Sequence, residues 1–257
     1  MNNLDTLIEN GLVVTENEIG YLNIGIKDGK IAYLGDENLN AEFKINASDL
    51  IVLPGGIDPH VHVDQPSGDD VIMADNFQSA TKSAAAGGNT TILPFAMQIK
   101  GQSLRKCVED YHKKAQGNMY IDTSFHLIIS DPTPQVLGQE LPALSKDGYT
   151  SFKVFMTYDD LVLNDKELIE VFDVAKQLKT LVMVHAEGYD SIKYLSDKFE
   201  KEGKTAPYYH APTRPQIVER EATHRAISHA QIVDIPIMIV HVSGEEALNQ
   251  IRWAKDK

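Results

Sequence analysis

The sequence predicts an α/β protein built from repeated parallel βα units and preceded by a small β module. From Ile57 onward, short β-rich runs alternate with longer stretches at helical spacing. This alternation is the sequence form of a parallel sheet with helical crossovers. Residues 1–53 instead read as short strands separated by tight-turn signals, so we expect a separate β portion there.

Two dipeptides indicate hairpins in the first 53 residues. Asn10-Gly11 and Asp28-Gly29 each lie between alternating apolar residues. Asn, Asp and Gly tolerate the positive φ angles that two-residue hairpin turns require. We therefore expect residues 1–53 to form a small β module.

The βα units can be placed one by one from the apolar periodicity. They fit either a doubly wound sheet or part of a (β/α)₈ barrel. No G-x-G-x-x-G or Walker sequence follows any expected strand, which disfavours a nucleotide-binding doubly wound sheet. The expected strands are 57–63, 90–95, 121–129, 150–156, 180–186 and 236–242, and the expected helices are 75–86, 103–116, 134–145, 165–178, 189–202, 214–230 and 245–254.

The number of units favours a barrel that is incomplete. A whole (β/α)₈ barrel takes about 250 residues, and the stretch from Ile57 to Lys257 holds about six of the eight units. An uncovered edge of a parallel sheet is unfavourable. We expect residues 54–257 to be a truncated TIM-barrel domain, and the chain to be a fragment.

Composition and charge exclude several classes of protein. The 257 residues include 37 acidic and 24 basic side chains, a formal net charge of −13, whereas nucleic-acid binders need clustered Lys and Arg. The single cysteine, Cys107, forms no internal disulfide and suits a reducing compartment. The start MNNLDTLIENGLVV has an acidic residue where a secretory signal needs basic ones, so we expect no such signal. The apolar runs are far shorter than the ~20 residues of a membrane span. We expect a cytoplasmic protein without nucleic-acid or membrane partners.

The motif Pro54-Gly-Gly-Ile-Asp-Pro-His-Val-His62 is the first candidate site. In a strand, residues i and i+2 point to the same face about 6.6 Å apart, so His60 and His62 can converge on one metal ion. The alternative is a pair of histidines that flank a turn and titrate in solvent. The pair closes an apolar strand, at the end where barrel enzymes place their sites, which favours the metal site.

Lys153 lies inside the β-rich run Thr150–Met156. Burying an ammonium costs several kcal/mol or lowers its pKa. A neutral lysine amine can react with carbon dioxide to form a carbamate, whose two oxygens can bridge two cations. The alternative is a lysine whose stem is buried and whose amine reaches solvent.

His185 and His241 each close a further apolar strand. Four strands thus deliver His60, His62, Lys153, His185 and His241 to one rim. Imidazoles and an anionic bridging group suit a pair of divalent ions such as Zn²⁺. Two such ions can activate water and polarise a carbonyl for amide or ester hydrolysis. We interpret the other five histidines, His112, His126, His210, His224 and His229, as structural.

These motifs resemble those of the amidohydrolase superfamily: PGGIDPHVH, FKVFMTYDD, VMVHAEG and MIVHVSG. FKVFMTYDD together with GKTAPYYHAPTRPQIVEREATHRAI resembles more narrowly the D-hydantoinase and dihydropyrimidinase branch. The resemblance covers almost the whole chain. It implies a metal-dependent (β/α)₈ barrel beside a β-sandwich built from both chain ends.

The resemblance also implies roles for individual residues. His60 and His62 would bind one divalent ion, His185 and His241 the other, and carbamylated Lys153 would bridge the two, with Zn²⁺ the favoured metal. Tyr158 would contact the substrate carbonyl and stabilise the developing oxyanion, unless it only packs on the barrel rim. An aspartate from an eighth strand, which this sequence does not reach, would complete the centre.

The implied reaction is hydrolysis of a small cyclic ureide, a dihydropyrimidine or hydantoin, to an N-carbamoyl amino acid, as in pyrimidine catabolism. A homotetramer is implied as well. An allantoinase or dihydroorotase type of cyclic amidohydrolase is the alternative within enzymes. A non-catalytic scaffold or an inactive truncated product is the alternative outside them.

Overall fold

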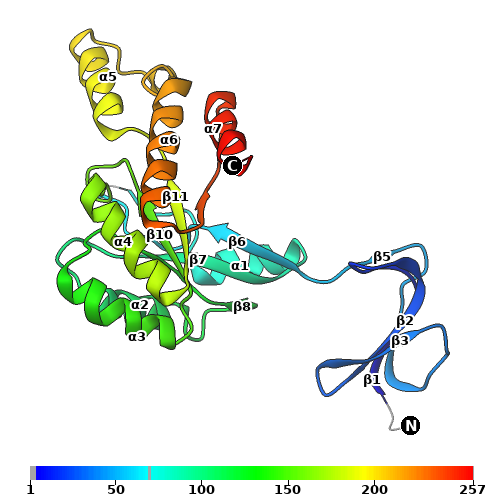
Figure 1. Ribbon diagram of the computed structural model, residues 1–257. Helices are drawn as coiled ribbons and strands as arrows, with labels where there is room; N and C mark the ends of the chain where they lie inside the picture. Colours follow the sequence, from blue (N-terminus) through cyan, green and yellow to red (C-terminus); the bar gives the residue numbers. More distant parts are fainter. Residues whose placement is uncertain (1–3, 69–70, 257) are drawn as a thin grey trace. The chain divides into compact units, whose positions relative to one another are not determined.

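The computed structural model describes residues 4–68 and 71–256. The chain divides into two compact units, Met1–Gly56 and Ile57–Lys257, drawn in Figure 1. Each unit has its own sheet. The second unit carries the residues of the predicted site.

The first unit is a 5-stranded sheet in the order β3-β2-β1-β4, with β5 also paired to β1. The β1/β2 and β2/β3 pairs are antiparallel, whereas β4 and β5 run parallel to β1. The strands are β1 (Leu4–Val14), β2 (Ile19–Lys27), β3 (Lys30–Gly35), β4 (Ala41–Asn46) and β5 (Ile51–Val52).

One of the two predicted hairpin turns is confirmed and the other is wrong. Asp28 and Gly29 both have positive φ and join β2 to β3. Asn10 also has positive φ, but it lies inside β1, where the register with β2 shifts between Ile8 and Gly11. Asn10-Gly11 is therefore a β-bulge. The Asn10 side chain donates to Asn46 Oδ1 at 3.1 Å, which stabilises the bulge against β4.

Many large apolar side chains of this sheet remain exposed. Exposed apolar side chains of this kind can pack against a further layer of structure. The exposed side chains are Ile19, Tyr21, Ile31, Leu34, Phe43, Ile45, Leu50 and Ile51.

The second unit is the parallel α/β sheet that the sequence predicts. Its strand order is β12-β11-β10-β9-β7-β6, with β8 also paired to β7. Each registered pair in it is parallel. The strands are β6 (Gly56–Val61), β7 (Asn89–Met97), β8 (Asp122–Thr123), β9 (His126–Ile128), β10 (Ser151–Phe155), β11 (Leu181–His185) and β12 (Ile237–Ile239).

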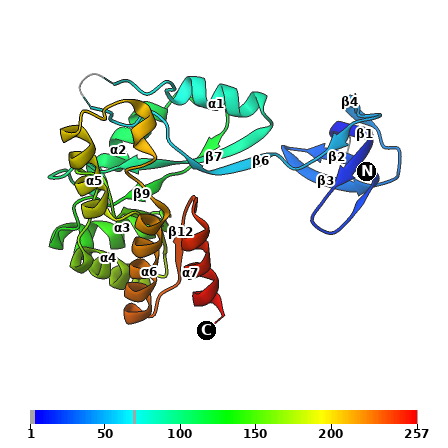
Figure 2. The same ribbon diagram turned by 90° about the horizontal axis from the view of Figure 1, so that it is seen from above.

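The helices follow the strands at the predicted places, as Figures 1 and 2 show. Asn76 and Asn164 form capping boxes at the starts of α1 and α4, which satisfies orphan backbone N–H groups there. Two expectations differ in detail: residues 121–129 form two short strands, and residues 134–145 begin with a π-helical turn over Val136–Glu140. The α-helices are α1 (Phe77–Ala86), α2 (Leu104–Ala115), α3 (Leu141–Lys146), α4 (Asp165–Leu178), α5 (Tyr189–Lys201), α6 (Gln216–Val233) and α7 (Glu245–Lys255), and a 3₁₀ turn spans Pro207–His210.

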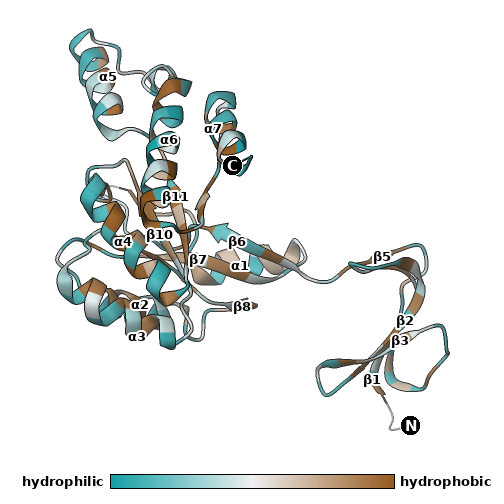
Figure 3. Cartoon of the chain, in the orientation of Figure 1, coloured by the Kyte–Doolittle hydropathy of each residue, from teal (hydrophilic) through white to brown (hydrophobic). Residues whose placement is uncertain are grey.

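The two faces of the parallel sheet bury different side chains. One face packs against the helices, and its core joins strand residues such as Val154 and Val184 to helix residues such as Phe172. Figure 3 colours much of β7 and β10 as hydrophobic. The other face carries a smaller group, here called the inner cluster: Phe95, Ile128, Phe155, Met183 and Val240. The predicted site lies on this inner face.

A hollow of this unit lies beside β12, away from the predicted site. It measures about 690 Å³ and has mostly apolar walls, including Ile227, Ile237 and Ile251. None of the predicted site residues lines it. Within residues 4–68 and 71–256, we find no helix with the length and apolarity that a membrane crossing requires.

Candidate metal centre

Strand alternation places the predicted ligands on the inner face of the sheet. In β10, Phe152 and Val154 belong to the helix-side core, so Lys153 and Phe155 point the opposite way. Phe155 pairs in register with His185 of β11. The same period of two therefore puts Lys153 and His185 on one face.

Lys153 is fully buried and its amine has no hydrogen-bond partner. The side chain is 0% exposed, and Nζ lies 5.2 Å from the centre of the Phe95 ring and 5.1 Å from that of Phe155. Desolvation lowers the pKa of Lys153 to about 7. A buried amine without a partner is unfavourable in a folded protein, so this position is suited to a group that would occupy the space beside Nζ.

The four predicted histidines form a row of contacting rings around this amine. The ring centres of His62 and His60 are 5.7 Å apart, those of His60 and His241 5.5 Å, and those of His241 and His185 4.5 Å. The Phe95 ring supports this row, because it contacts the rings of both His60 and His62. The structure thus brings together all five side chains, each of which lies in one of four strands or within two residues of its end.

The electrostatics favour neutral imidazoles at His60, His62 and His241. Desolvation is the main cause that lowers the pKa of His60 and of His241 to about 4. The next cause is a neighbouring charge, from Lys153 for His60 and from His185 for His241. Desolvation also lowers the pKa of His62. Neutral imidazole is the form that ligates a metal ion, so these residues fit a divalent cation.

Among the described residues, no group of three or more His, Cys, Asp or Glu side chains is arranged so that it could hold a metal ion by itself. The predicted ligand set does not require such a group. It assigns two histidines to each ion and takes the shared ligand from Lys153, which is none of these residue types.

Tyr158 lies next to the histidine row with an unusual backbone conformation. Its ring centre is 5.2 Å from that of His185, and its φ is +72°. His241 also has positive φ, at +37°. Non-glycine residues rarely adopt such angles, and they concentrate where a site must aim a side chain. Desolvation raises the pKa of Tyr158, so its hydroxyl stays protonated and can donate.

A cleft of about 460 Å³ opens beside Tyr158. Its walls include the apolar side chains Met97, Leu161 and Ile192 and the cation Arg214. This volume is within the range of pockets for small ligands. The cleft is smaller than the hollow beside β12, but it is lined by Tyr158, whose ring contacts that of His185.

Two residues at the site were not among the candidates found from the sequence. Gln65 Oε1 lies 2.8 Å from His62 Nδ1, and Glu187 Oε2 lies 2.7 Å from His185 Nε2. Glu187 could have been noticed, because it follows His185 by two residues in VMVHAEG. Nothing in the local sequence distinguishes Gln65 from an ordinary loop residue.

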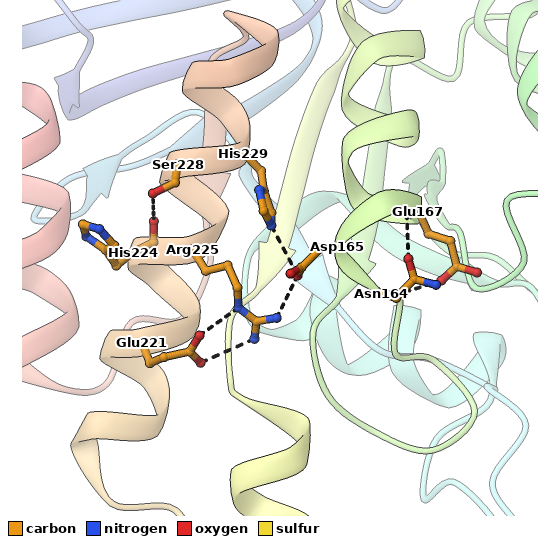
Figure 4. Close-up of polar contacts among 8 residues, drawn as sticks. All are labelled: Asn164, Asp165, Glu167, Glu221, His224, Arg225, Ser228 and His229. Atoms are coloured by element: carbon orange, nitrogen blue, oxygen red, sulfur yellow. Dashed lines mark hydrogen bonds and ion pairs between the residues drawn. The ribbon is translucent and has the colours of Figure 1, made fainter.

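The five histidines interpreted as structural have other partners. His126 Nε2 donates to Pro59 O at 2.9 Å, and His126 Nδ1 lies 2.5 Å from Ser151 Oγ. Figure 4 shows His224 and His229 on α6, with His229 Nε2 3.2 Å from Asp165 Oδ1. His112 contacts Tyr149, His210 contacts Arg214, and His224 contacts Gln250.

Comparison with known proteins agrees with this geometry. Residues 51–242 match the model of the amidohydrolase family. The chain is 46% identical over 255 residues to a D-hydantoinase of Ralstonia pickettii, covering 99% of this chain and 55% of that protein. It is 36% identical to the dihydropyrimidinase of Rattus norvegicus, covering 97% of this chain and 49% of that protein.

The solved structures give the same result. The crystal structure of a dihydropyrimidinase from Brevibacillus agri superimposes with a TM-score of 0.93 at 40% identity, over 98% of this chain and 55% of that one. The resemblance and the fold class predicted from the motifs are thus confirmed. The chain spans about half the length of the relatives it matches.

Proposed function

Because the chain belongs to the amidohydrolase family, we propose that it carries most of the active site of a binuclear-metal cyclic amidohydrolase. The proposed reaction is hydrolysis of the ring amide of a dihydropyrimidine or hydantoin to an N-carbamoyl amino acid. The D-hydantoinases and dihydropyrimidinases to which the chain is similar support this substrate class.

The observation that carries the proposal is the orphaned amine of Lys153. Its pKa near 7 leaves much of the amine neutral at physiological pH. The nitrogen lone pair can attack the carbon of dissolved CO₂, forming an N–C bond while one N–H proton leaves to solvent. The carbamate would place two oxygens, which share one negative charge, beside Nζ among the contacting imidazoles.

The remaining ligands follow from the histidine row. His60 and His62 would hold one divalent ion and His185 and His241 the other, with the Lys153 carbamate shared between them. When bound, the two metal ions supply an activated water and a Lewis acid for the ring carbonyl. Zn²⁺ is the ion best suited to this mixture of nitrogen and oxygen ligands.

The chain's other residues would bind and orient the ring. The Tyr158 hydroxyl would donate to the carbonyl oxygen as negative charge develops on it. The cleft beside Tyr158 would take the ring substituent against Met97 and Leu161. These apolar walls would also exclude water from that side of the ring.

The wider organisation is proposed on the same basis. Residues 1–53, with their exposed apolar side chains, would form half of a composite sandwich, and residues 54–257 the metal-dependent barrel domain. A cytoplasmic location is supported by the buried free thiol of Cys107. The homotetramer rests on the family resemblance alone.

Metal analysis of three matched proteins tests the proposal: the wild type, Lys153→Met, and Lys166→Met as a control on an exposed face of α4. We expect about two divalent ions per chain in the wild type and in the control, and fewer in Lys153→Met. ¹³C NMR after equilibration with ¹³C-bicarbonate should show a carbamate signal that Lys153→Met lacks. Hydrolysis at the wild-type rate by Lys153→Met would refute the bridging role.

Substrate assays separate the proposed function from its rivals. Dihydrouracil, hydantoin, allantoin and dihydroorotate are compared at equal concentration. We expect the first two to be hydrolysed fastest. Preference for allantoin or dihydroorotate would instead assign the chain to another cyclic amidohydrolase class.

A further inference from the structure

A chain of hydrogen bonds links His62 to the backbone of a neighbouring strand. Gln65 Oε1 lies 2.8 Å from His62 Nδ1, and Gln65 Nε2 donates to Phe95 O at 3.0 Å. Phe95 belongs to β7, and its ring also stacks on the His62 ring, with centres 4.8 Å apart and an interplanar angle of 20°. One residue of the sheet thus supports both His62 and the amide that contacts it.

The carbonyl of Phe95 determines how the Gln65 amide is oriented, and therefore which ring nitrogen of His62 carries the proton. A carbonyl oxygen only accepts, so the NH₂ group of Gln65 must face Phe95. Oε1 of Gln65 then faces His62 and requires a donor. A neutral imidazole carries one proton, so that proton must be on Nδ1, and Nε2 keeps a free lone pair.

We propose that Gln65 is a positioning residue that holds His62 as the Nδ1–H tautomer and presents its Nε2 to the cation. This inference rests on the proposed function, because it takes His62 as a ligand. Hydrogen bonds from outside the ligand set commonly fix the tautomer and orientation of a ligating histidine.

The loop that carries Gln65 is itself fastened to the protein. Asp64 adopts a φ of +51°, which turns the chain back after His62. Lys114 Nζ, on α2, donates to Asp64 O at 2.6 Å and to its Oδ1 at 3.2 Å. The turn therefore holds Gln65, three residues after His62, within reach of both His62 and Phe95.

The experiment compares wild type, Gln65→Met, Gln65→Glu and Gln177→Met. Methionine has a similar length but offers no strong acceptor. Glutamate still accepts from Nδ1–H, although it cannot donate to Phe95 O. Gln177 is exposed on α4 and serves as the matched control. Each protein is made with ¹⁵N-labelled histidine, freed of metal, and examined by ¹⁵N NMR, with His62→Asn identifying the His62 signals. Zn²⁺ affinity is then measured by competition with a chelating dye.

We expect Nδ1–H at His62 in the wild type, in Gln65→Glu and in Gln177→Met. Gln65→Met should populate the Nε2–H tautomer and weaken Zn²⁺ binding by about 10- to 100-fold. An unchanged His62 spectrum in Gln65→Met, or Nε2–H in the wild type, would overturn this inference alone. Failure of the wild type to bind Zn²⁺ would overturn the proposed function, and the inference with it.

Discussion

Glu187 accepts a hydrogen bond from the ring of His185, with Oε2 2.7 Å from Nε2. Both side chains are largely buried, 21% and 12% exposed. The hydrogen bond to His185 is the main cause that lowers the pKa of Glu187, so the carboxylate is ionised and can only accept. This hydrogen bond requires a proton on His185 Nε2, which leaves Nδ1 as the nitrogen that would face a cation.

Removing this carboxylate should weaken metal binding at the His185 end of the row. We expect Glu187→Ala to lower Zn²⁺ affinity by about 10- to 100-fold, and Glu187→Gln, which keeps a carbonyl acceptor, to lower it less. Zn²⁺ content after dialysis against a chelator measures the effect, with the exposed Glu200→Ala as control. Equal retention of Zn²⁺ by Glu187→Ala and the control would contradict this role.

Replacing Tyr158 should affect turnover more than substrate binding. Tyr158→Phe keeps the ring against His185 but removes the hydroxyl that would donate to the developing oxyanion. Loss of one such donor lowers kcat by about 10²- to 10³-fold. Steady-state kinetics of Tyr158→Phe and of Tyr194→Phe, an exposed tyrosine on α5, measure the difference. A purely structural Tyr158 would leave kcat unchanged.

The ion pairs between α4 and α6 should contribute little to stability. Arg225 Nη1 lies 2.8 Å from Asp165 Oδ1, as drawn in Figure 4, but the two side chains are 33% and 51% exposed. Solvent screens such pairs, so a double-mutant cycle of Asp165→Ala and Arg225→Ala should give a coupling below about 1 kcal/mol. Urea unfolding at low and high salt tests this, and a large coupling that salt does not reduce would contradict it.

Cys107 should be unreactive in the folded protein. Its side chain is 1% exposed, and desolvation raises the pKa of the thiol from 9.0 to about 12. A thiol reagent should therefore label Cys107 at pH 8 only after denaturant is added. Labelling of the folded protein at the rate seen in denaturant would disprove this.

The same shift sets a pH dependence of stability. Between pH 9 and 12 the unfolded chain has lost the Cys107 proton while the folded protein keeps it. The free energy of unfolding should then fall as pH rises, by at most about 1.4 kcal/mol per pH unit. Cys107→Ala should lack this component of the slope. Identical slopes in the two proteins would contradict the raised pKa.

The features that could be predicted from the sequence depend on periodicity. Lys153 and His185 each lie in a strand whose alternating neighbours are apolar, and a lysine in such a strand must face either a core or a site. Period-two alternation fixes which face each residue takes without knowledge of the partner strands. The βα order and the five candidate ligands could be placed for that reason.

The features that could not be predicted depend on partners distant in the chain. Asn10-Gly11 has the local preference of a hairpin turn, but the pairing of β1 with β2 on both sides of it makes it a bulge. The role of Gln65 depends on Phe95, thirty residues away, whose carbonyl orients the amide. Local sequence contains neither relationship.

The register of β10 couples folding to chemistry. Deleting one residue between Gly148 and Phe152 would turn Phe152 and Val154 toward the histidines and drive the Lys153 amine among the helices. Such a deletion would abolish the hydrophobic contact with α4 and the carbamate position in one step. A change of one residue in the length of the segment leading into this strand would therefore remove both.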